Sequence, residues 1–95
     1  MRIVEAQVLG DLRMRLTFAD GLVRELDLDP ALRGGILDQV REQELFDQVT
    51  VDSLSGTITW PNGVDLDPDV LHGDDEPASG SGPALIREYR LNPTT

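Results

Sequence analysis

Residues 56–73 read GTITWPNGVDLDPDVLHG and contain the strongest fold signals in the chain. Residues 57–60 form a β-branched and aromatic run that is typical of a strand, and Asn62-Gly63 is a tight-turn signal. A short return strand is expected over residues 64–66. This part of the stretch therefore predicts a β-hairpin.

A single helical turn is expected directly after this hairpin. Asp67 followed by Pro68 predicts an N-cap with proline at the first helical position, and Gly73 predicts the stop. The same Asp-Leu-Asp-Pro string begins upstream at Asp27, where Asp29 takes the capping position. Both strings therefore predict a hairpin followed by a short, capped helical turn.

The first third of the chain predicts a three-stranded antiparallel meander. Strands are expected over residues 2–9, 12–18 and 22–28, with turn signals at Gly10-Asp11 and in Ala19-Asp20-Gly21. Residues 12–18 alternate without a break, so one face must be buried. That face consists of Leu12, Met14, Leu16 and Phe18.

A helix and two further strands complete the predicted domain. Ile36, Leu37 and Val40 have helical spacing, and a fourth strand is expected over residues 49–52. We therefore predict an α+β fold, an antiparallel sheet of about five strands in the order βββ-α-ββ. One main helix packs on this sheet, and short capped helical turns complete a single domain over residues 1–76.

The sequence predicts a flexible linker and tail over residues 77–95, because the composition changes to Pro, Gly and Ser. An apolar-basic segment follows the linker. Leu85, Ile86 and Tyr89 would share one face of a helix, whereas Leu85, Tyr89 and Leu91 would align on a strand, and the spacing leaves both open. We expect this segment to be disordered alone and to order only against a partner or a second copy of the chain.

The charge of the chain is −10 and is concentrated in its middle. Residues 25–76 contain fourteen acidic residues and two arginines. Such a surface repels phosphate backbones, so we expect no direct binding to nucleic acid. A basic protein is the better electrostatic match.

Length and composition limit the remaining function classes. Ninety-five residues without cysteine exclude a disulfide scaffold and thiolate metal sites. No apolar run approaches the ~18 residues of a membrane span and no signal peptide is evident, so we expect a cytoplasmic protein without membrane contact. Because so short a chain has a small core, a homodimer is a reasonable expectation.

The spacing of Asp65, Asp67 and Asp69, with Glu76 at the twelfth place, matches a calcium-binding EF-hand loop. However, Val70 occupies the position that needs glycine, and no amphipathic helix precedes the string. We therefore expect the aspartates to cap helical turns and predict no metal site.

The sequence offers no combination of catalytic residues. His72 is the only histidine, and no motif places Ser53 or Ser55 beside it. We therefore expect no enzymatic activity, no catalytic residue and no cofactor. Trp60 is expected either in the core or as an interface anchor. The residues considered for partner binding are Trp60, Asn62, Asp65, Asp67, Asp69, Leu85, Ile86 and Tyr89.

Four strings of the chain resemble a known bacterial family. They are LTFADG at residues 16–21, DL at residues 27–28, FDQVTVD at residues 46–52 and GTITWPNGVDL at residues 56–66. The family is catalogued as domain of unknown function 2442, and the resemblance covers residues 2–72. It implies an α+β domain built on an antiparallel sheet, and it carries over no catalytic residue.

The resemblance also implies a genetic context. Family members are often encoded beside a small toxin-like protein, and some carry a helix-turn-helix domain after the shared part. Nothing after Glu76 predicts a helix-turn-helix here, and Ile36-Leu37 stand where proline or an aromatic residue is typical.

We therefore interpret the chain as a non-enzymatic, acidic protein-binding module, an antitoxin-like partner of a small, basic, toxin-like protein. One alternative is an accessory domain of transcriptional regulation that acts through a partner. Another is a divalent-metal-dependent enzyme or a metal-binding protein that uses the aspartate string.

Overall fold

The computed structural model of the chain describes residues 1–32, 38–42, 44–74 and 82–91, which form an α+β fold. In this part of the chain, no helix is long and apolar enough to cross a membrane. The strands are β1 (Ile3–Gly10), β2 (Arg13–Phe18), β3 (Leu22–Asp27), β4 (Thr50–Asp52), β5 (Thr57–Thr59) and β6 (Ala84–Arg90). The helices are α1 (Asp38–Glu42) and α2 (Pro68–His72), with 3-10 turns η1 (Asp29–Ala31) and η3 (Phe46–Gln48).

The main sheet confirms the predicted meander of β1, β2 and β3. Neighbouring strands are antiparallel, with Ala6 opposite Leu16 and Met14 opposite Leu26. Alternation along β2 buries Met14, Leu16 and Phe18, each at most 1% exposed, because one face of this sheet carries the core. Leu12 differs from the prediction, since it lies in the turn before β2 and is only half-buried.

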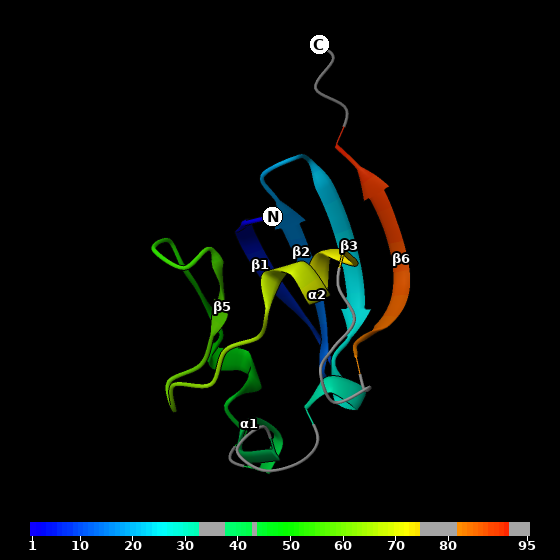
Figure 1. Cartoon of the computed structure of the whole chain (residues 1–95). Coiled ribbons are helices and arrows are strands. Elements are labelled where there is room, and N and C mark those ends of the chain that lie inside the picture. Colours follow the sequence, from blue (N-terminus) through cyan, green and yellow to red (C-terminus); the bar gives the residue numbers. More distant parts are fainter. Residues whose placement is uncertain (33–37, 43, 75–81, 92–95) are drawn as a thin grey trace.

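Strand β6, which lies in the segment expected to be a flexible tail, is an edge strand of this sheet. The strand order is β1-β2-β3-β6, and Val23 of β3 lies opposite Tyr89 of β6. Figure 1 shows β6 alongside β3 at one side of the sheet. Residues 84–90 are therefore ordered within the single chain, contrary to the prediction, because the edge of β3 supplies backbone hydrogen-bond partners.

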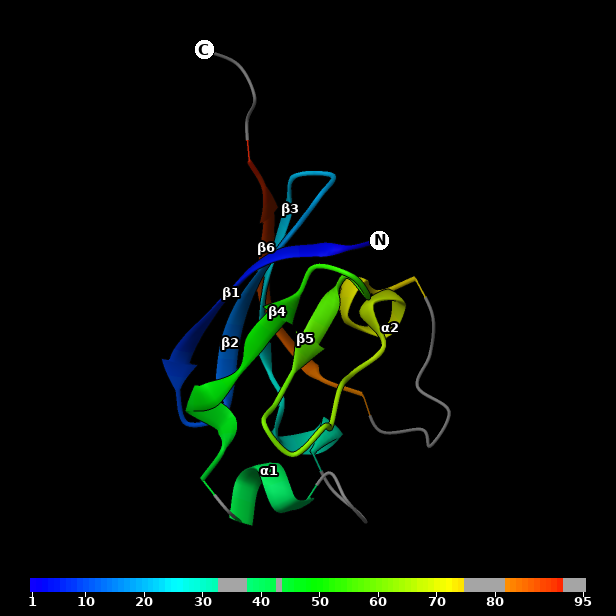
Figure 2. The ribbon, with the colours of Figure 1, turned by 90° about the vertical axis from the view of Figure 1, so that its left-hand side faces the viewer.

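We expected one sheet of about five strands. The described residues instead form a four-stranded sheet and a separate two-stranded sheet. β4 and β5 pair antiparallel with each other, with Val51 opposite Ile58. The pair meets β1 at its beginning, where the Ile3 N–H donates to the Gly56 carbonyl at 2.8 Å. Figure 2 shows the pair packed across one side of the main sheet. Burial of Ile58 drives this packing, since that side chain is fully buried in the shared core.

The prediction of one main helix packed on the sheet also differs from the structure. Within the described residues, α1 and α2 have five residues each. Val40 of α1 and Leu71 of α2 are buried in the core, so each helix contributes one anchor. α2 lies over the sheet and α1 lies at one end of it (Figures 1 and 2). Ile36 and Leu37, on which the helix prediction relied, lie outside the described residues.

The two expected caps have different outcomes. The Asp67 carboxylate accepts a hydrogen bond from the Asp69 N–H at 2.9 Å, and Gly73 ends α2 at φ 97°, as predicted. At the upstream copy the N-cap is Leu28, without a side-chain cap. Asp27, two residues before the expected cap Asp29, accepts from the Asp29 N–H at 3.0 Å.

Candidate functional site

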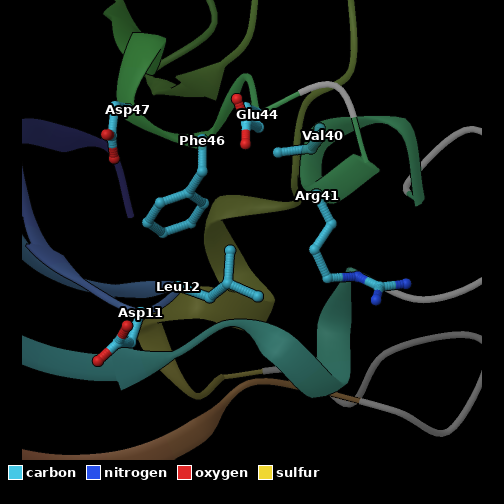
Figure 3. A pocket seen from close by; sticks show the side chains of 7 residues that line it. All are labelled: Asp11, Leu12, Val40, Arg41, Glu44, Phe46 and Asp47. Carbon is cyan, nitrogen blue, oxygen red and sulfur yellow. The ribbon is translucent and has the colours of Figure 1, made fainter.

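An open pocket of about 480 Å³ lies at the end of the sheet where α1 is placed. We call it the acidic pocket. The β1–β2 turn contributes one wall, and α1 with the segment after it contributes the other (Figure 3). Its lining residues are Asp11, Leu12, Val40, Arg41, Glu44, Phe46 and Asp47.

The floor of the acidic pocket is apolar. Phe46 and Leu12 point toward each other in Figure 3, and Val40 lies beside them. Val40 and Phe46 belong to the core, with exposed fractions of 0% and 5%, and Leu12 packs against it. The floor is therefore rigid, because core packing holds each of these side chains in place.

Three carboxylates surround this floor. Asp11 lies 3.3 Å from an Arg13 guanidinium nitrogen, an ion pair that is exposed and therefore weak. The Glu44 and Asp47 side chains make no hydrogen bond or ion pair with the described part of the chain. At Glu44 and Asp47 the pocket thus presents negative charge that no side chain in the described part of the chain compensates.

Arg41, the one basic residue of the lining, is engaged elsewhere. Its Nε donates to the Leu32 carbonyl at 3.2 Å, and its Nη2 donates to Asp38 at 2.7 Å. Figure 3 shows the guanidinium turned away from the phenylalanine ring. Its charge is therefore largely matched by Asp38 and does not neutralise the rim.

The backbone of the acidic pocket is unusual. Asp11, Leu12 and Glu44 have φ values of 50°, 62° and 56°, and among the described residues they are the non-glycine positions with positive φ. Asp11 and Leu12 form the turn between β1 and β2, where Asn-Gly is the favoured pair. Glu44 follows α1 at a helix-ending position that usually carries glycine.

The opposite end of the sheet carries a second group of charged residues, the histidine cluster of Asp20, His72 and Asp74. The two ring nitrogens of His72 each lie 2.9 Å from a carboxylate oxygen, one of Asp20 and one of Asp74. The His72 ring also packs edge-on against Phe18, with centroids 4.8 Å apart. The cluster therefore ties the C-terminus of α2 to the β2–β3 turn.

Asp20 is held ionised by its surroundings. The Leu22 N–H, opposed by partial desolvation and reinforced by His72 and Arg90, keeps the pKa of Asp20 below its ordinary value. The Leu22 N–H donates to this carboxylate at 3.0 Å, and an Arg90 nitrogen lies 3.5 Å away. The carboxylates of this cluster therefore have partners, in contrast to Glu44 and Asp47 of the acidic pocket within the described residues.

Two of the predicted contact residues have structural roles. Trp60 is 3% exposed, and its Nε1–H donates to the Phe46 carbonyl at 3.1 Å, so it belongs to the core. Asn62 shapes the hairpin turn, since its side-chain oxygen accepts from the Val64 N–H at 3.2 Å. Trp60 supports the pocket floor from behind, because its ring packs at 6.2 Å from that of Phe46.

The three aspartates of the EF-hand-like spacing, Asp65, Asp67 and Asp69, have different surroundings. Asp65 is exposed beside β5, Asp67 caps α2, and Asp69 lies 2.7 Å from the Met1 amino group. The described residues contain no group of three histidine, cysteine or acidic side chains that could hold a metal ion. Glu76, the last residue of the EF-hand spacing, lies outside the described residues.

The remaining predicted contacts lie on edge strand β6. Leu85, Ile86 and Tyr89 are 48%, 47% and 37% exposed. Their part in partner binding stays a prediction. The eight predicted contact residues therefore lie in the β5–α2 connection, in the first turn of α2 and on β6, and none of them lines the acidic pocket.

Sequence reasoning missed the acidic pocket because its wall comes from segments about thirty residues apart. The turn at Gly10-Asp11 was recognised, but not the extension of the turn to Leu12. Phe46 follows the α1 segment as an apolar anchor, yet nothing in the local pattern indicates that Glu44 has positive φ. The signal in the sequence that could have indicated the pocket is the density of acidic residues around the apolar pair Leu45-Phe46.

Comparison with known proteins yields one match. The model of a family described as "Protein of unknown function (DUF2442)" matches residues 3–75. No curated protein and no solved structure matches the chain.

Proposed function

For this chain, which belongs to the DUF2442 family, we propose the function of a non-enzymatic protein-binding module with a basic protein as partner. The observation that carries the proposal is the acidic pocket. It combines an apolar floor with two carboxylates, Glu44 and Asp47, that pair with no side chain in the described part of the chain. Such a combination suits an interface, where apolar contact supplies affinity and charge selects the partner.

The distribution of charge supports the same partner class. The four strands of the main sheet carry a net formal charge of +1. Residues 38–74 contain nine acidic residues and one arginine, which gives −8 with His72 neutral. We call residues 38–74 the acidic layer, and most of the lining of the acidic pocket belongs to it. A basic protein is therefore attracted toward the pocket before contact is made.

The family resemblance suggests which basic protein to test. We propose that the chain acts as the antitoxin-like half of a pair with the small toxin-like protein encoded beside it. Neutralising a basic partner requires an acidic surface and no catalytic residues. The edge of β6, with Leu85, Ile86 and Tyr89, is a second predicted contact for the same partner.

The proposal is tested by co-expressing the full chain with the product of the adjacent gene. Affinity capture at about 0.15 M salt should recover a complex of defined mass in light scattering, and raising the salt to about 0.5 M should weaken it. In cells, the partner alone should slow growth and co-expression should restore it. If capture recovers no partner even at about 0.05 M salt, where electrostatic attraction is strongest, the proposed function is wrong.

A further inference from the structure

We infer that the acidic pocket receives one arginine side chain of the partner, an inference that rests on the proposed function. The aliphatic stem would lie on Leu12 and Phe46, and the guanidinium would meet the carboxylates of Glu44 and Asp47. The proposal thus names the chemistry that this module recognises.

The shape of the acidic pocket favours a long, amphipathic side chain. An open volume of about 480 Å³ with an apolar floor can accept several methylene groups, while the charged end stays at the rim. The rim is wet, since Asp11, Glu44 and Asp47 are all exposed. A cation at this position therefore keeps part of its hydration and avoids the large penalty of full burial.

The number of carboxylates favours arginine over lysine. A guanidinium has five N–H donors in a planar fork, so it can serve two carboxylates at once. Glu44 and Asp47 are both without a partner in the described part of the chain. Arg41 does not compete for them, because Leu32 and Asp38 hold its guanidinium.

The other aspartates of the acidic layer are less suited to this role. Asp67 caps α2, Asp69 lies against the Met1 amino group, and Asp52 accepts hydrogen bonds from Leu54 and Ser55. Glu42 and Asp65 are exposed but do not line the pocket. Among the described residues of this layer, Glu44 and Asp47 therefore combine carboxylates without a partner with an adjacent apolar floor.

The backbone indicates that these acidic residues are retained at a cost in stability. Asp11 and Glu44 occupy positions with φ of 50° and 56°, where glycine is the more stable choice. Asp11 is exposed, with 89% of its side chain accessible, so packing does not explain its presence. A carboxylate that faces a cationic partner does explain it.

The first test uses nuclear magnetic resonance of the full chain labelled with nitrogen-15. The probe is Nα-acetyl-arginine amide, and the matched control is Nα-acetyl-citrulline amide, which has nearly the same shape without the charge. We expect saturable shifts for the amides of Leu12, Glu44 and Asp47 with the arginine probe alone. Equal shifts with citrulline, or shifts centred on the residues 65–69, would overturn the inference.

The second test compares two double variants with the same change of charge in the capture experiment with the adjacent gene product. Glu44→Gln with Asp47→Asn alters the acidic pocket, and Glu5→Gln with Glu42→Gln alters exposed acids that do not line it. We expect the pocket variant to weaken binding about tenfold or more and the control variant less than about twofold. Urea unfolding should confirm that both variants remain folded.

The outcomes separate the inference from the proposed function. If the wild-type chain binds no basic protein, the proposed function fails, whatever the arginine probe shows. If the wild-type chain binds the partner and both double variants bind equally well, the proposed function stands and the arginine pocket is wrong.

Discussion

The turns at the two ends of the main sheet differ in their backbone conformation and in the pairing of their carboxylates. At the end with the histidine cluster, the β2–β3 turn uses glycine at positive φ, Gly21 at 89°, and Asp20 is paired with His72. At the end with the acidic pocket, Gly10 also has positive φ, at 101°, but the two residues after it, Asp11 and Leu12, take positive φ without being glycine. One end is therefore arranged for stability.

The other end departs from the stable arrangement in backbone and in charge together. The acidic pocket has strained positions at Asp11 and Glu44, and the carboxylates of Glu44 and Asp47 have no partner among the described residues. Departures of this kind are common where a surface is kept for a ligand. The comparison therefore supports the proposal that partner binding takes place at the pocket end.

The largest effect is expected where the core supports the pocket floor. Trp60→Ala removes a side chain that is 3% exposed and packs against Phe46. We expect a loss of about 3–5 kcal/mol in the free energy of unfolding, because a large cavity remains. Urea unfolding followed by circular dichroism measures the loss.

Trp60→Phe is the matched control for this variant. It keeps most of the ring volume but leaves the Phe46 carbonyl without the Nε1–H donor. The expected loss is about 1–2 kcal/mol. If Trp60→Ala lost no more stability than Trp60→Phe, the tryptophan would not be an anchor of the core and other residues would support the floor.

A smaller loss is expected at the end with the histidine cluster. Gly21→Ala places a Cβ on a residue at φ 89°, which costs about 1–2 kcal/mol. A Cβ there would lie 3.7 Å from the Leu91 carbonyl, an ordinary contact, so the loss reports on backbone strain. Urea midpoints measure it, with Asp11→Ala as control, because that variant keeps a Cβ at positive φ. Equal losses for the two variants would contradict the comparison.

The acidic pocket should respond with the opposite sign. Asp11→Gly and Glu44→Gly remove backbone strain, so each should raise the free energy of unfolding by about 0.5–1 kcal/mol. Both variants should also bind the basic partner more weakly. Thermal and urea unfolding measure the first effect, and affinity capture measures the second. Destabilisation by either glycine would show that the positions are not strained.

The sequence could predict the elements that repeat a local pattern. The alternation in β2 identified Met14, Leu16 and Phe18 as core, and Asp67-Pro68 identified the start of α2. Both features depend on neighbours within a few residues. Local patterns are sufficient for such elements.

The sequence could not predict features that depend on distant partners. Residues 84–90 carry both helical and strand spacing, and only the edge of β3, about sixty residues earlier, decides for the strand. Likewise, the β4–β5 pair could extend the main sheet or pack on its face. The acidic pocket also depends on a long-range arrangement, the position of α1 relative to the β1–β2 turn.

The smallest effect concerns the charge of Asp20 and its pH dependence. Because its pKa is lowered in the folded state, Asp20 stabilises the fold above its ordinary pKa of 3.8 and loses this contribution as the pH falls through the folded pKa. Asp20→Asn removes the charge but keeps an oxygen that can accept the Leu22 N–H. The urea midpoints of wild type and variant should therefore differ at pH 7 and converge below pH 3.8.

Asp65→Asn is the matched control, since Asp65 is exposed and lies outside the histidine cluster. Its midpoint should follow that of the wild type across the same pH range. A gap for Asp20→Asn that stays constant down to acid pH would mean that the carboxylate charge does not hold the turn. The two ends of the sheet would then differ in backbone conformation alone. The paired carboxylate of Asp20 could no longer serve as the stabilising case with which the carboxylates of the acidic pocket are compared.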